Sequence, residues 1–353
     1  MSTTAETTVR LSAETLLAFG IALAEAQGMN AADARTLVEI MVRCDARGIS
    51  SHGLYRLPSY LRRMAAGGIN PKARPQIVRE SGATAVVDAH HASGYVASRF
   101  AMDTAIALAE QFGIGAVGVR NSNHFGAAGA YVLQAAERGM IGIASTNAPA
   151  CMAPWGGITQ MLGNNPFAFA APRANGDPFV LDFALSQVAK GWVRLAHAAK
   201  RAIPSGWAMD AQGRPTTDSG EAMRGLLVPI GMYKGTGLSI AMDLLAGLLV
   251  GSAPSGELAH QESMDTHGLV GHFFLALQIE RFTALDDFRA KTGALLDRIE
   301  GSTRAIGVDR LLIPGKIEAD KERAAASDGV RIAAETWSEL LKDAQRLGVT
   351  PPA

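Results

Sequence analysis

The sequence predicts an α/β protein with a mixed β-sheet and a helical unit formed by the two ends of the chain. Apolar residues recur at helical spacing near both termini, over residues 11–66 and over the charged segment 283–353. Between them, short apolar runs alternate with amphipathic stretches, a pattern typical of β-α-β units. We therefore expect a helical domain of residues 1–75 with 283–353 and a mixed-sheet domain of residues 76–282.

The first predicted elements are helices with recognisable ends. Ser12 and Asn30 are good N-cap residues for two helices, and Gly48 follows where the second helix would stop. Turn-forming residues 67–75 then mark a boundary before a short strand at 85–88.

Helices and strands alternate after this boundary. The periodicity predicts helices over 95–112 and 125–138 and strands over 114–119 and 141–145. Beyond residue 156 the pattern is looser, and we expect a helix from about Lys234 and strands at 166–171, 179–183 and 272–278.

Composition argues against several classes of function. Thirty-three Lys plus Arg balance 33 Asp plus Glu, so no excess charge favours nucleic acid or an anionic membrane. The longest apolar run, 236–252, is shorter than the roughly 20 residues that a bilayer requires. Cys44 and Cys151 are far apart, and the histidines lack a ligand-like pairing, so we expect no disulfide and no metal site. Without a secretory signal, a cytoplasmic location is expected.

Residues 113–118 match the glycine pattern G-x-G-x-x-G. In a dinucleotide-binding Rossmann fold this pattern follows a strand and opens a helix. Here it follows a predicted helix and is itself the predicted strand. We interpret it as a strand of small residues packed against its neighbours, and we expect a fold of another type.

A better candidate anion site is the segment 121–126, where a predicted strand leads into a predicted helix. Free amides and the positive end of a helix dipole favour a phosphate or carboxylate at such a junction. His124 adds a further donor. The alternative is that Asn121 and Asn123 are helix caps and His124 is an ordinary loop histidine.

The second candidate site follows Gly48. A helix running to about Met64 would place His52, Arg56 and Tyr60 four residues apart on one face. Arg binds a carboxylate through two parallel hydrogen bonds, and His can donate a proton near neutral pH, so the group suits a 2-oxo or 2-imino acid. Ser51 could orient the imidazole. The alternative is a pair of capping residues beside a surface arginine.

Three other polar residues are weaker candidates. Asp182 ends a predicted strand, where it could bind a ribose hydroxyl, orient a histidine or cap the next segment. Lys234, between Gly231 and Gly235 at a helix start, could bind a phosphate or carboxylate. Asp243 lies in an apolar helix as a paired core carboxylate or as support for a site.

Seven short motifs stand in a distinctive order along most of the chain. They are DARGISSHG at 45–53, NHFG at 123–126, APWGG at 153–157, GNNPFA at 163–168, PSGW at 204–207, GRPTTD at 213–218 and KGTGL at 234–238. Together they resemble the malate/L-lactate dehydrogenase-like oxidoreductases, the family that includes ureidoglycolate dehydrogenase and piperideine-2-carboxylate reductase.

The resemblance implies hydride transfer between NAD(P)H and C2 of a small 2-oxo acid or cyclic 2-imino acid. It implies a non-Rossmann NAD(P)-binding fold used as a homodimer. In that family's pattern His52 would be the proton donor assisted by Ser51, and Arg56 would bind the substrate carboxylate. Tyr60, Met152 and Trp155 would line the substrate pocket.

The resemblance also implies a set of cofactor contacts. These are His124, Phe125, Gly126, Ala127, Ala128, Asn164, Asp182, Phe183, Ala184, Lys234, Gly315 and Lys316. Either NAD or NADP would serve. Lys316, Lys321 and Arg323 could pair with a 2′-phosphate, which slightly favours NADPH, although a basic face on a terminal helix is usually only solvated.

The chain departs from the family pattern in three places. Trp192 follows Gly191 where the family usually has Lys, Thr236 stands where it usually has Tyr, and residues 253–270 keep little of the pattern. Two other functions stay open, the first because His plus Arg would serve it equally well and the second because of the departures at Trp192 and Thr236. One is a hydro-lyase or amidohydrolase acting on small carboxylates, and the other is a non-catalytic ligand-binding relative.

Overall fold

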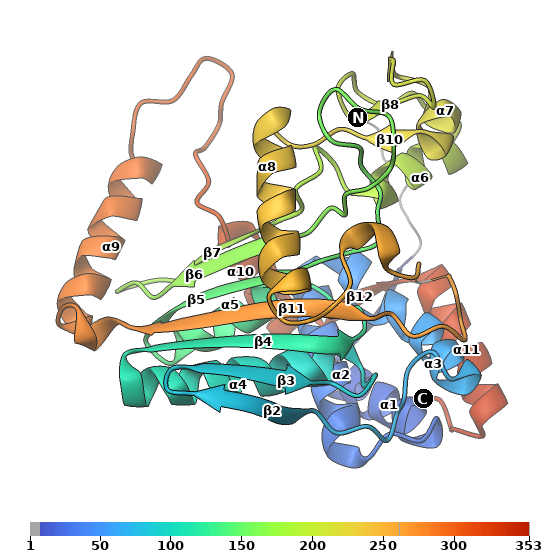
Figure 1. Ribbon diagram of the computed structural model, residues 1–353, viewed down its shortest axis with the longest axis horizontal. Coiled ribbons are helices and arrows are strands. Elements are labelled where there is room, and N and C mark those ends of the chain that lie inside the picture. Colours follow the sequence, from blue (N-terminus) through green and yellow to red (C-terminus); the bar gives the residue numbers. More distant parts are fainter. Residues whose placement is uncertain (1–7, 261, 353) are drawn as a thin grey trace.

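A seven-stranded mixed sheet forms the centre of the computed structural model, which describes residues 8–260 and 262–352 (Figure 1). Only β3 and β4 are parallel neighbours, and every other adjacent pair in this sheet is antiparallel. The strands are, in spatial order, β2 (Gln76–Ser81), β3 (Thr84–Asp88), β4 (Ile114–Ser122), β11 (Val270–Gln278), β5 (Met140–Thr146), β6 (Phe167–Ala171) and β7 (Phe179–Phe183). Strand β11 comes late in the chain and lies between β4 and β5, so the order differs from that of a Rossmann sheet.

Glycines in the strands allow helices to approach both faces of this sheet. Helices α4 (Gly94–Phe112) and α5 (Gly129–Glu137) cover one face. A Cβ added at Gly115 of β4 would lie 2.0 Å from the carbonyl oxygen of Ala105 in α4. On the other face, a Cβ at Gly118 would lie 2.3 Å from Val250. The glycine pattern of residues 113–118 thus serves packing, as the sequence predicted.

The second face carries a long helical segment that rises from the sheet (Figure 1). It begins as α8 (Tyr233–Met242) and continues as a π-helical stretch, η3 (Asp243–Leu248). Buried Asp243 accepts hydrogen bonds from the backbone N–H of Ser255 at 3.1 Å and from its hydroxyl at 2.8 Å. It is therefore a paired carboxylate, one of the two roles the sequence suggested.

The two ends of the chain meet in a two-stranded antiparallel sheet. Strand β1 (Thr8–Leu11) pairs with β12 (Val330–Ala333). Around this pair α1 contacts α11, α2 contacts α10, and α3 contacts α11. These helices are α1 (Ala13–Ala26), α2 (Ala31–Ala46), α3 (Leu57–Ala66), α10 (Lys316–Asp328) and α11 (Ala334–Leu347). Ser12 and Asn30 cap α1 and α2 as predicted, because each side chain accepts the backbone N–H three residues on.

Helix α9 (Leu285–Glu300) lies apart from the other terminal helices, at the β6–β7 side of the sheet (Figure 1). The N–H of Ala174, after β6, donates to the carbonyl of Arg289 in α9 at 3.0 Å. The chain returns to the terminal helices only at α10. The division into residues 1–75 with 283–353 and residues 76–282 stays a prediction.

A small lobe with its own apolar cluster follows β7. Its elements are α6 (Lys190–Ala198), β8 (Ala208–Met209), β9 (Pro215–Thr216), α7 (Ser219–Arg224) and β10 (Leu226–Leu227). The three strands form a sheet in the order β10-β8-β9. Fully buried Met152 and Leu185 join this lobe's cluster, which is separate from the main core.

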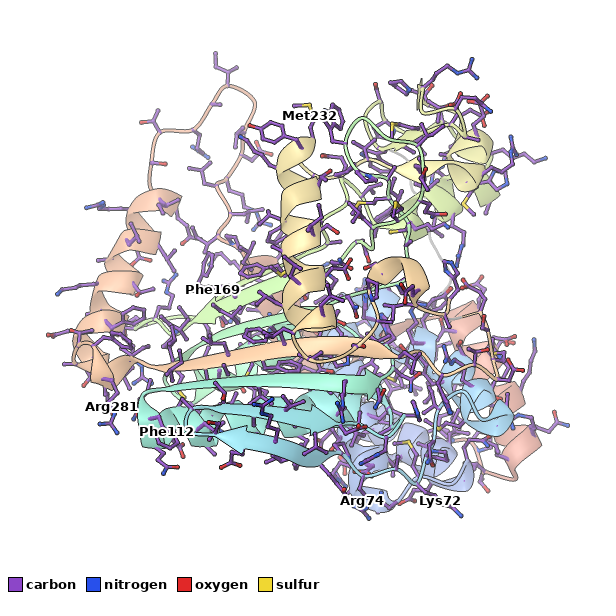
Figure 2. The ribbon with its side chains drawn as sticks, in the orientation of Figure 1. Lys72, Arg74, Phe112, Phe169, Met232 and Arg281 are labelled. Atoms are coloured by element: carbon purple, nitrogen blue, oxygen red, sulfur yellow. The ribbon has the colours of Figure 1, made fainter. Side chains whose placement is uncertain are left out.

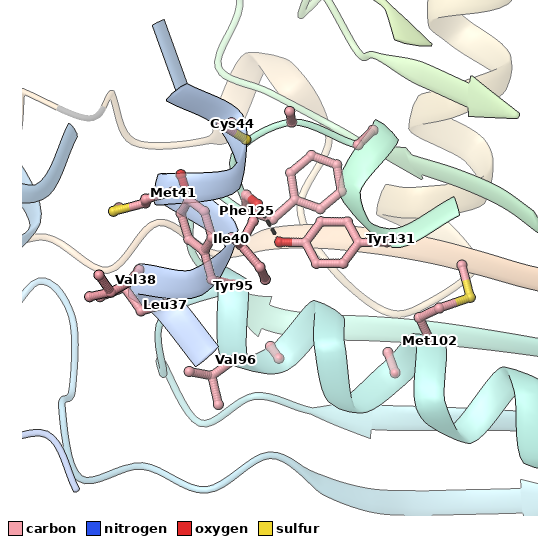
Figure 3. Close-up of a cluster of buried hydrophobic side chains, with 14 of the residues drawn as sticks. Leu37, Val38, Ile40, Met41, Cys44, Tyr95, Val96, Met102, Phe125 and Tyr131 are labelled. Carbon is pink, nitrogen blue, oxygen red and sulfur yellow. Dashed lines mark hydrogen bonds between the residues drawn. The ribbon is translucent and has the colours of Figure 1, made fainter. Parts of the chain in front are cut away.

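The main core lies between α2, α4 and α5 (Figure 3). Phe125 packs against Tyr131, with ring centroids 5.3 Å apart, and Met41 of α2 and Tyr95 of α4 are buried in the same cluster. The Tyr131 hydroxyl donates to the carbonyl of Phe125. Phe125 also stacks on buried His272, with ring centroids 4.7 Å apart. The segment that follows Asn123 is therefore anchored in the core of the molecule.

Among the described residues, no helix is both long and apolar enough to span a bilayer. The short 3-10 turns of the described residues are η1 (Ser50–His52), η2 (Leu54–Arg56), η4 (Ser255–Glu257) and η5 (Ile279–Arg281).

Candidate active site

The segment that carries His52 is not the continuous helix that the sequence predicted. Residues Ser50–His52 and Leu54–Arg56 form two 3-10 turns, η1 and η2, and α3 begins only at Leu57. Pro58 lies in the first turn of α3, where its missing N–H costs nothing, whereas a helix from residue 51 would place it in the interior. His52 and Arg56 therefore lie on separate turns, and Tyr60 lies on the helix.

Buried Asp45 of α2 shapes this break in the helix. Its carboxylate accepts the N–H of Leu54 at 2.7 Å, and a Cβ at Gly53 would lie 2.1 Å from the same carboxylate. Burial raises the pKa of Asp45 to about 7, opposed by the hydrogen bond from Leu54. Sequence reasoning used Asp45 only as part of a motif and gave it no role.

Ser51, His52 and Arg56 are nevertheless brought together. The Ser51 hydroxyl and His52 Nδ1 are 2.8 Å apart, and Arg56 Nε donates to the Ser51 carbonyl at 2.9 Å. Burial and, to a smaller extent, the positive charge of Arg56 lower the pKa of His52 to about 4. The imidazole is therefore neutral near pH 7 in the free protein, with a guanidinium beside it.

His124 completes this cluster from the loop after β4. Its ring stacks on that of His52, with centroids 5.6 Å apart and an interplanar angle of 19°. Its Nδ1 is 2.5 Å from the hydroxyl of Tyr60 and accepts the N–H of Gly126 at 3.3 Å. Tyr60 is only 4% exposed, so it contacts His124 rather than lining an open pocket.

The loop 121–128 differs from the predicted strand-to-helix junction. Gly126 adopts a left-handed conformation, with φ of +80°, and α5 begins at Gly129 rather than near residue 125. The N–H of Gly129 is already used, because it donates to Asp182 Oδ2 at 2.7 Å. The helix start thus binds a carboxylate of this chain, and the predicted free anion site is wrong in that respect.

Asn121 and Asn123 cap no helix. Asn121 donates to Asp88 at 2.8 Å, and Asn123 donates to the carbonyls of His91 and Ala92, each at 3.0 Å. Buried Arg63 donates to Asn123 Oδ1 at 3.3 Å. Both asparagines therefore fix the backbone just before His124 against residues 88–92.

Arg63 is a residue that sequence reasoning missed. Besides Asn123 it donates to the carbonyl of Thr266 at 2.7 Å, so it joins the divergent segment 253–270 to the loop of His124. In the same segment the ring of His267 stacks on His91, with centroids 3.7 Å apart. Its position one helical turn after Tyr60 is the signal that could have identified Arg63.

Asp182, at the end of β7, connects the loop of His124 to α10. Its side chain is exposed, yet the surrounding protein reduces its hydration and raises its pKa to about 6. The hydrogen bond from Gly129 lowers this pKa, and the negative charge of Glu318 in α10 raises it. The N–H of Val180 donates to the carbonyl of Pro314 at 3.2 Å, which places Gly315 and Lys316 beside β7. Lys316 lies 3.8 Å from Glu300.

The remaining candidates lie along the contacts between the sheet and the small lobe. The N–H of Leu185, next to Phe183 and Ala184, donates to the carbonyl of Asn164 at 2.7 Å. The N–H of Ile230 donates to the Leu185 carbonyl at 2.9 Å. Exposed Lys234, four residues further along the chain, lies at the start of α8.

Met152 and Trp155 differ in exposure. The side chain of Met152 is fully buried in the small lobe, whereas Trp155 is 49% exposed. The N–H of Trp155 donates to the hydroxyl of Thr236 at 3.0 Å. Thr236, one of the departures from the family pattern, thus fixes the Trp155 turn against α8.

Among the described residues, no group of three or more His, Cys, Asp or Glu side chains is arranged to bind a metal ion. The site consists of the imidazoles of His52 and His124, the guanidinium of Arg56 and the hydroxyl groups of Ser51 and Tyr60. The carboxylate of Asp182 lies at the far end of the loop that carries His124.

Comparison with known proteins agrees with this architecture. A family model described as malate/L-lactate dehydrogenase matches residues 11–341. The chain belongs to the malate/L-lactate dehydrogenase family. Malate dehydrogenase of Pyrococcus abyssi is 36% identical over 352 residues, which are 98% of this chain and 96% of that protein. L-sulfolactate dehydrogenase of Methanocaldococcus jannaschii is 38% identical over 325 residues, covering 91% and 92%.

Solved structures support the same assignment. Malate dehydrogenase from Entamoeba histolytica superposes with a TM-score of 0.94 at 29% identity and covers 98% of this chain and 100% of that one. The predicted family resemblance and the non-Rossmann mixed-sheet fold are confirmed. The protein is an oxidoreductase of this family, which disfavours the hydro-lyase, amidohydrolase and non-catalytic alternatives.

Proposed function

We propose that the protein transfers a hydride between NAD(P)H and C2 of a small 2-oxo acid or cyclic 2-imino acid. The observation that carries this proposal is the contact of His52 with Ser51 and of Ser51 with Arg56, beside the stacked ring of His124. A planar cation and two imidazoles in one cluster suit a substrate with a carboxylate next to a polar double bond.

Arg56 binds the substrate carboxylate in this proposal. The hydrogen bond from Nε to the Ser51 carbonyl orients the guanidinium plane. Because the charge of Arg56 lowers the pKa of His52, a carboxylate bound to Arg56 offsets that effect and favours protonation of the imidazole. Substrate binding thus prepares His52 to donate its proton.

His52 then supplies the proton that accompanies reduction. When bound, the reduced nicotinamide would supply a hydride to C2, which is one proton with two electrons. The C2 double bond opens toward its oxygen or nitrogen, and that atom takes the proton from His52. Ser51 keeps the imidazole in place through Nδ1, 2.8 Å away. In the reverse direction His52 accepts the proton from the hydroxyl or amine.

The residues predicted for the cofactor fit NAD or NADP chemically. Exposed Asp182 uses Oδ2 for Gly129 but makes no other hydrogen bond within the described parts of the chain, so Oδ1 could accept a ribose hydroxyl. The exposed ammonium group of Lys234 suits a phosphate. The further proposed contacts are loop 124–128, Asn164, Phe183, Ala184, Gly315 and Lys316. Phe125, Ala127 and Ala128 of this loop are buried in this structure.

Either dinucleotide is proposed as the cofactor. The cations that suggested NADPH already face carboxylates, because Lys316 lies 3.8 Å from Glu300 and Arg323 lies 2.5 Å from both Asp177 and Asp320. A 2′-phosphate would have to compete with these acids.

We further propose that the protein acts as a homodimer and that α8 with η3 forms part of the contact. Large apolar side chains along this segment are exposed, including Tyr233 (63%), Leu244 (52%) and Leu248 (53%). Figure 2 shows Met232 at the end of α8 that is farther from the sheet. A second copy would cover this apolar surface, which a monomer rarely exposes. The cytoplasmic location remains a prediction from the sequence.

The dimer proposal is tested by measuring the molar mass of the chain in solution with Leu244→Glu. We expect a dimer that dissociates in this variant. Val78→Glu, at an exposed position of the edge strand β2, is the matched control and should leave the mass unchanged. A monomeric parent protein would contradict the proposal.

The catalytic proposal is tested by following the absorbance of reduced nicotinamide with NADH and NADPH and a panel of 2-oxo and cyclic imino acids. His52→Ala should lower kcat by roughly 10²- to 10⁴-fold and retain cofactor binding, measured by protein fluorescence. His197→Ala, in α6 of the small lobe, is the control histidine variant. Full activity of His52→Ala with the best substrate would remove His52 from its role.

A further inference from the structure

The two hydrogen bonds at Nδ1 of His124 determine which ring nitrogen carries its proton. The N–H of Gly126 can only donate, so Nδ1 must present its lone pair to that group at 3.3 Å. The hydroxyl of Tyr60, 2.5 Å from the same nitrogen, is then also a donor. The proton of the neutral ring therefore lies on Nε2.

We propose that Tyr60 is a positioning residue that fixes His124 as its Nε2–H tautomer, so that His124 offers the substrate a hydrogen-bond donor beside His52. The part of this statement that concerns the substrate rests on the proposed function. Sequence reasoning placed Tyr60 in the substrate pocket and His124 at the cofactor. The contact between them gives Tyr60 a different task, which it performs through His124.

The surroundings of Tyr60 suit a permanent donor. Its ring is 4% exposed and packs edge-on against Tyr95, with centroids 5.8 Å apart. Burial raises the pKa of Tyr60, so its hydroxyl keeps its proton at ordinary pH even though the charge of Arg56 opposes this effect. Tyr60 therefore cannot become the acceptor in this pair at neutral pH.

The surroundings of His124 keep its ring neutral. Burial lowers its pKa well below the usual range, and the groups that act in the same direction are Arg56, His52, His272 and Arg63. Nε2 of His124 has no hydrogen-bond partner among residues 8–260 and 262–352. A neutral ring with a free Nε2–H can donate to the oxygen or nitrogen on C2 without carrying a charge of its own.

The two stacked imidazoles then have different tasks. His52 is bonded to a serine hydroxyl, which can donate or accept, so its ring can gain and lose a proton. His124 accepts hydrogen bonds from two donors at Nδ1 and is held in its Nε2–H tautomer. We infer that His52 transfers the proton, whereas His124 orients the atom that receives it.

The first test reads the tautomer directly and needs no substrate. Protein labelled with ¹⁵N-histidine is compared by long-range ¹⁵N–¹H correlation spectra, and His124→Gln assigns the signals. We expect the Nε2–H form in the parent protein and a mixture of forms in Tyr60→Phe. Tyr131→Phe removes another buried hydroxyl, which donates to the carbonyl of Phe125, and should leave the His124 signals unchanged. An Nδ1–H signal in the parent, or identical spectra for the parent and Tyr60→Phe, would overturn the proposal.

The second test measures kinetics with the best substrate. Tyr60→Phe should lower kcat roughly 5-fold, because one hydrogen bond of about 1 kcal/mol is lost, and it should change KM little. Loss of the donor to Nδ1 favours the charged ring, so the acid limb of the pH profile should move to higher pH. An equal loss of kcat in Tyr131→Phe would show a merely structural effect. If no oxo or imino acid is reduced at all, the proposed function fails, whereas the tautomer is still decided by the spectra.

Discussion

Substitution of Gly115 by Ala tests whether the glycine pattern of residues 113–118 packs helices or binds phosphate. The new Cβ would lie 2.0 Å from the carbonyl oxygen of Ala105 and 2.9 Å from Cβ of Leu108, both in α4. A carbon normally approaches a carbonyl oxygen to about 3.3 Å, so α4 must move by roughly 1 Å. Because a backbone carbonyl cannot rotate away, the cost falls at the upper end of overpacking, about 3 kcal/mol.

Thermal unfolding and cofactor titration together measure this effect. We expect Gly115→Ala to lower Tm by about 4 °C, while the affinity of the folded fraction for NADH and NADPH changes little. Gly191→Ala is the matched control, because no atom lies within 4 Å of the added Cβ in α6. There, Ala should stabilise by up to about 1 kcal/mol. If Gly115→Ala had the same Tm as the parent protein but no longer bound NADH or NADPH, the glycine pattern would be a phosphate-binding loop after all.

Three further substitutions probe the site and its supports. Arg56→Lys keeps the charge but loses the planar pair of donors, so kcat/KM for 2-oxo acids should fall about 10-fold or more, whereas unchanged kinetics would make Arg56 a surface residue. The pKa of Asp45 is about 7 in the folded protein and near 4 in the unfolded chain, so the free energy of unfolding should fall as the pH rises from about 4 to about 7. This fall is on the order of 4 kcal/mol. Urea unfolding at several pH values should show that Asp45→Asn abolishes it. A Cβ at Gly126 would lie 2.6 Å from the ring of Tyr95, and φ there is +80°. Gly126→Val should therefore lower Tm, and an unchanged Tm would refute this packing.

Local signals in the sequence were sufficient for much of the fold. Ser12 and Asn30 cap their helices through side-chain contacts that span three residues, and Gly48 has the left-handed conformation that a helix end requires, with φ of +74°. The predicted strand 179–183 matches β7. These features depend on neighbours in sequence, so the amino-acid pattern alone identifies them.

Elements that depend on distant contacts were harder to predict. Helical spacing from residue 51 to 64 is real, yet the hydrogen bond from Leu54 to Asp45 and the position of Pro58 divide the segment. Helix α9 has a helical pattern like that of the other terminal helices, but its place beside β6 and β7 follows from tertiary packing. Periodicity predicts that a helix exists, not what it packs against.

The pairing of Gly129 with Asp182 changes what the loop after β4 can bind. Sequence reasoning treated the start of this helix as a set of free amides, but a carboxylate 53 residues further along the chain accepts one of them. A helix start that already faces a carboxylate attracts a second anion less strongly, because the two negative charges repel each other. If loop 124–128 contacts NAD(P), it should therefore meet an uncharged part such as a ribose or the nicotinamide. Exposed Lys234 is the better candidate for the phosphates, since a cation and the start of α8 act there in the same direction.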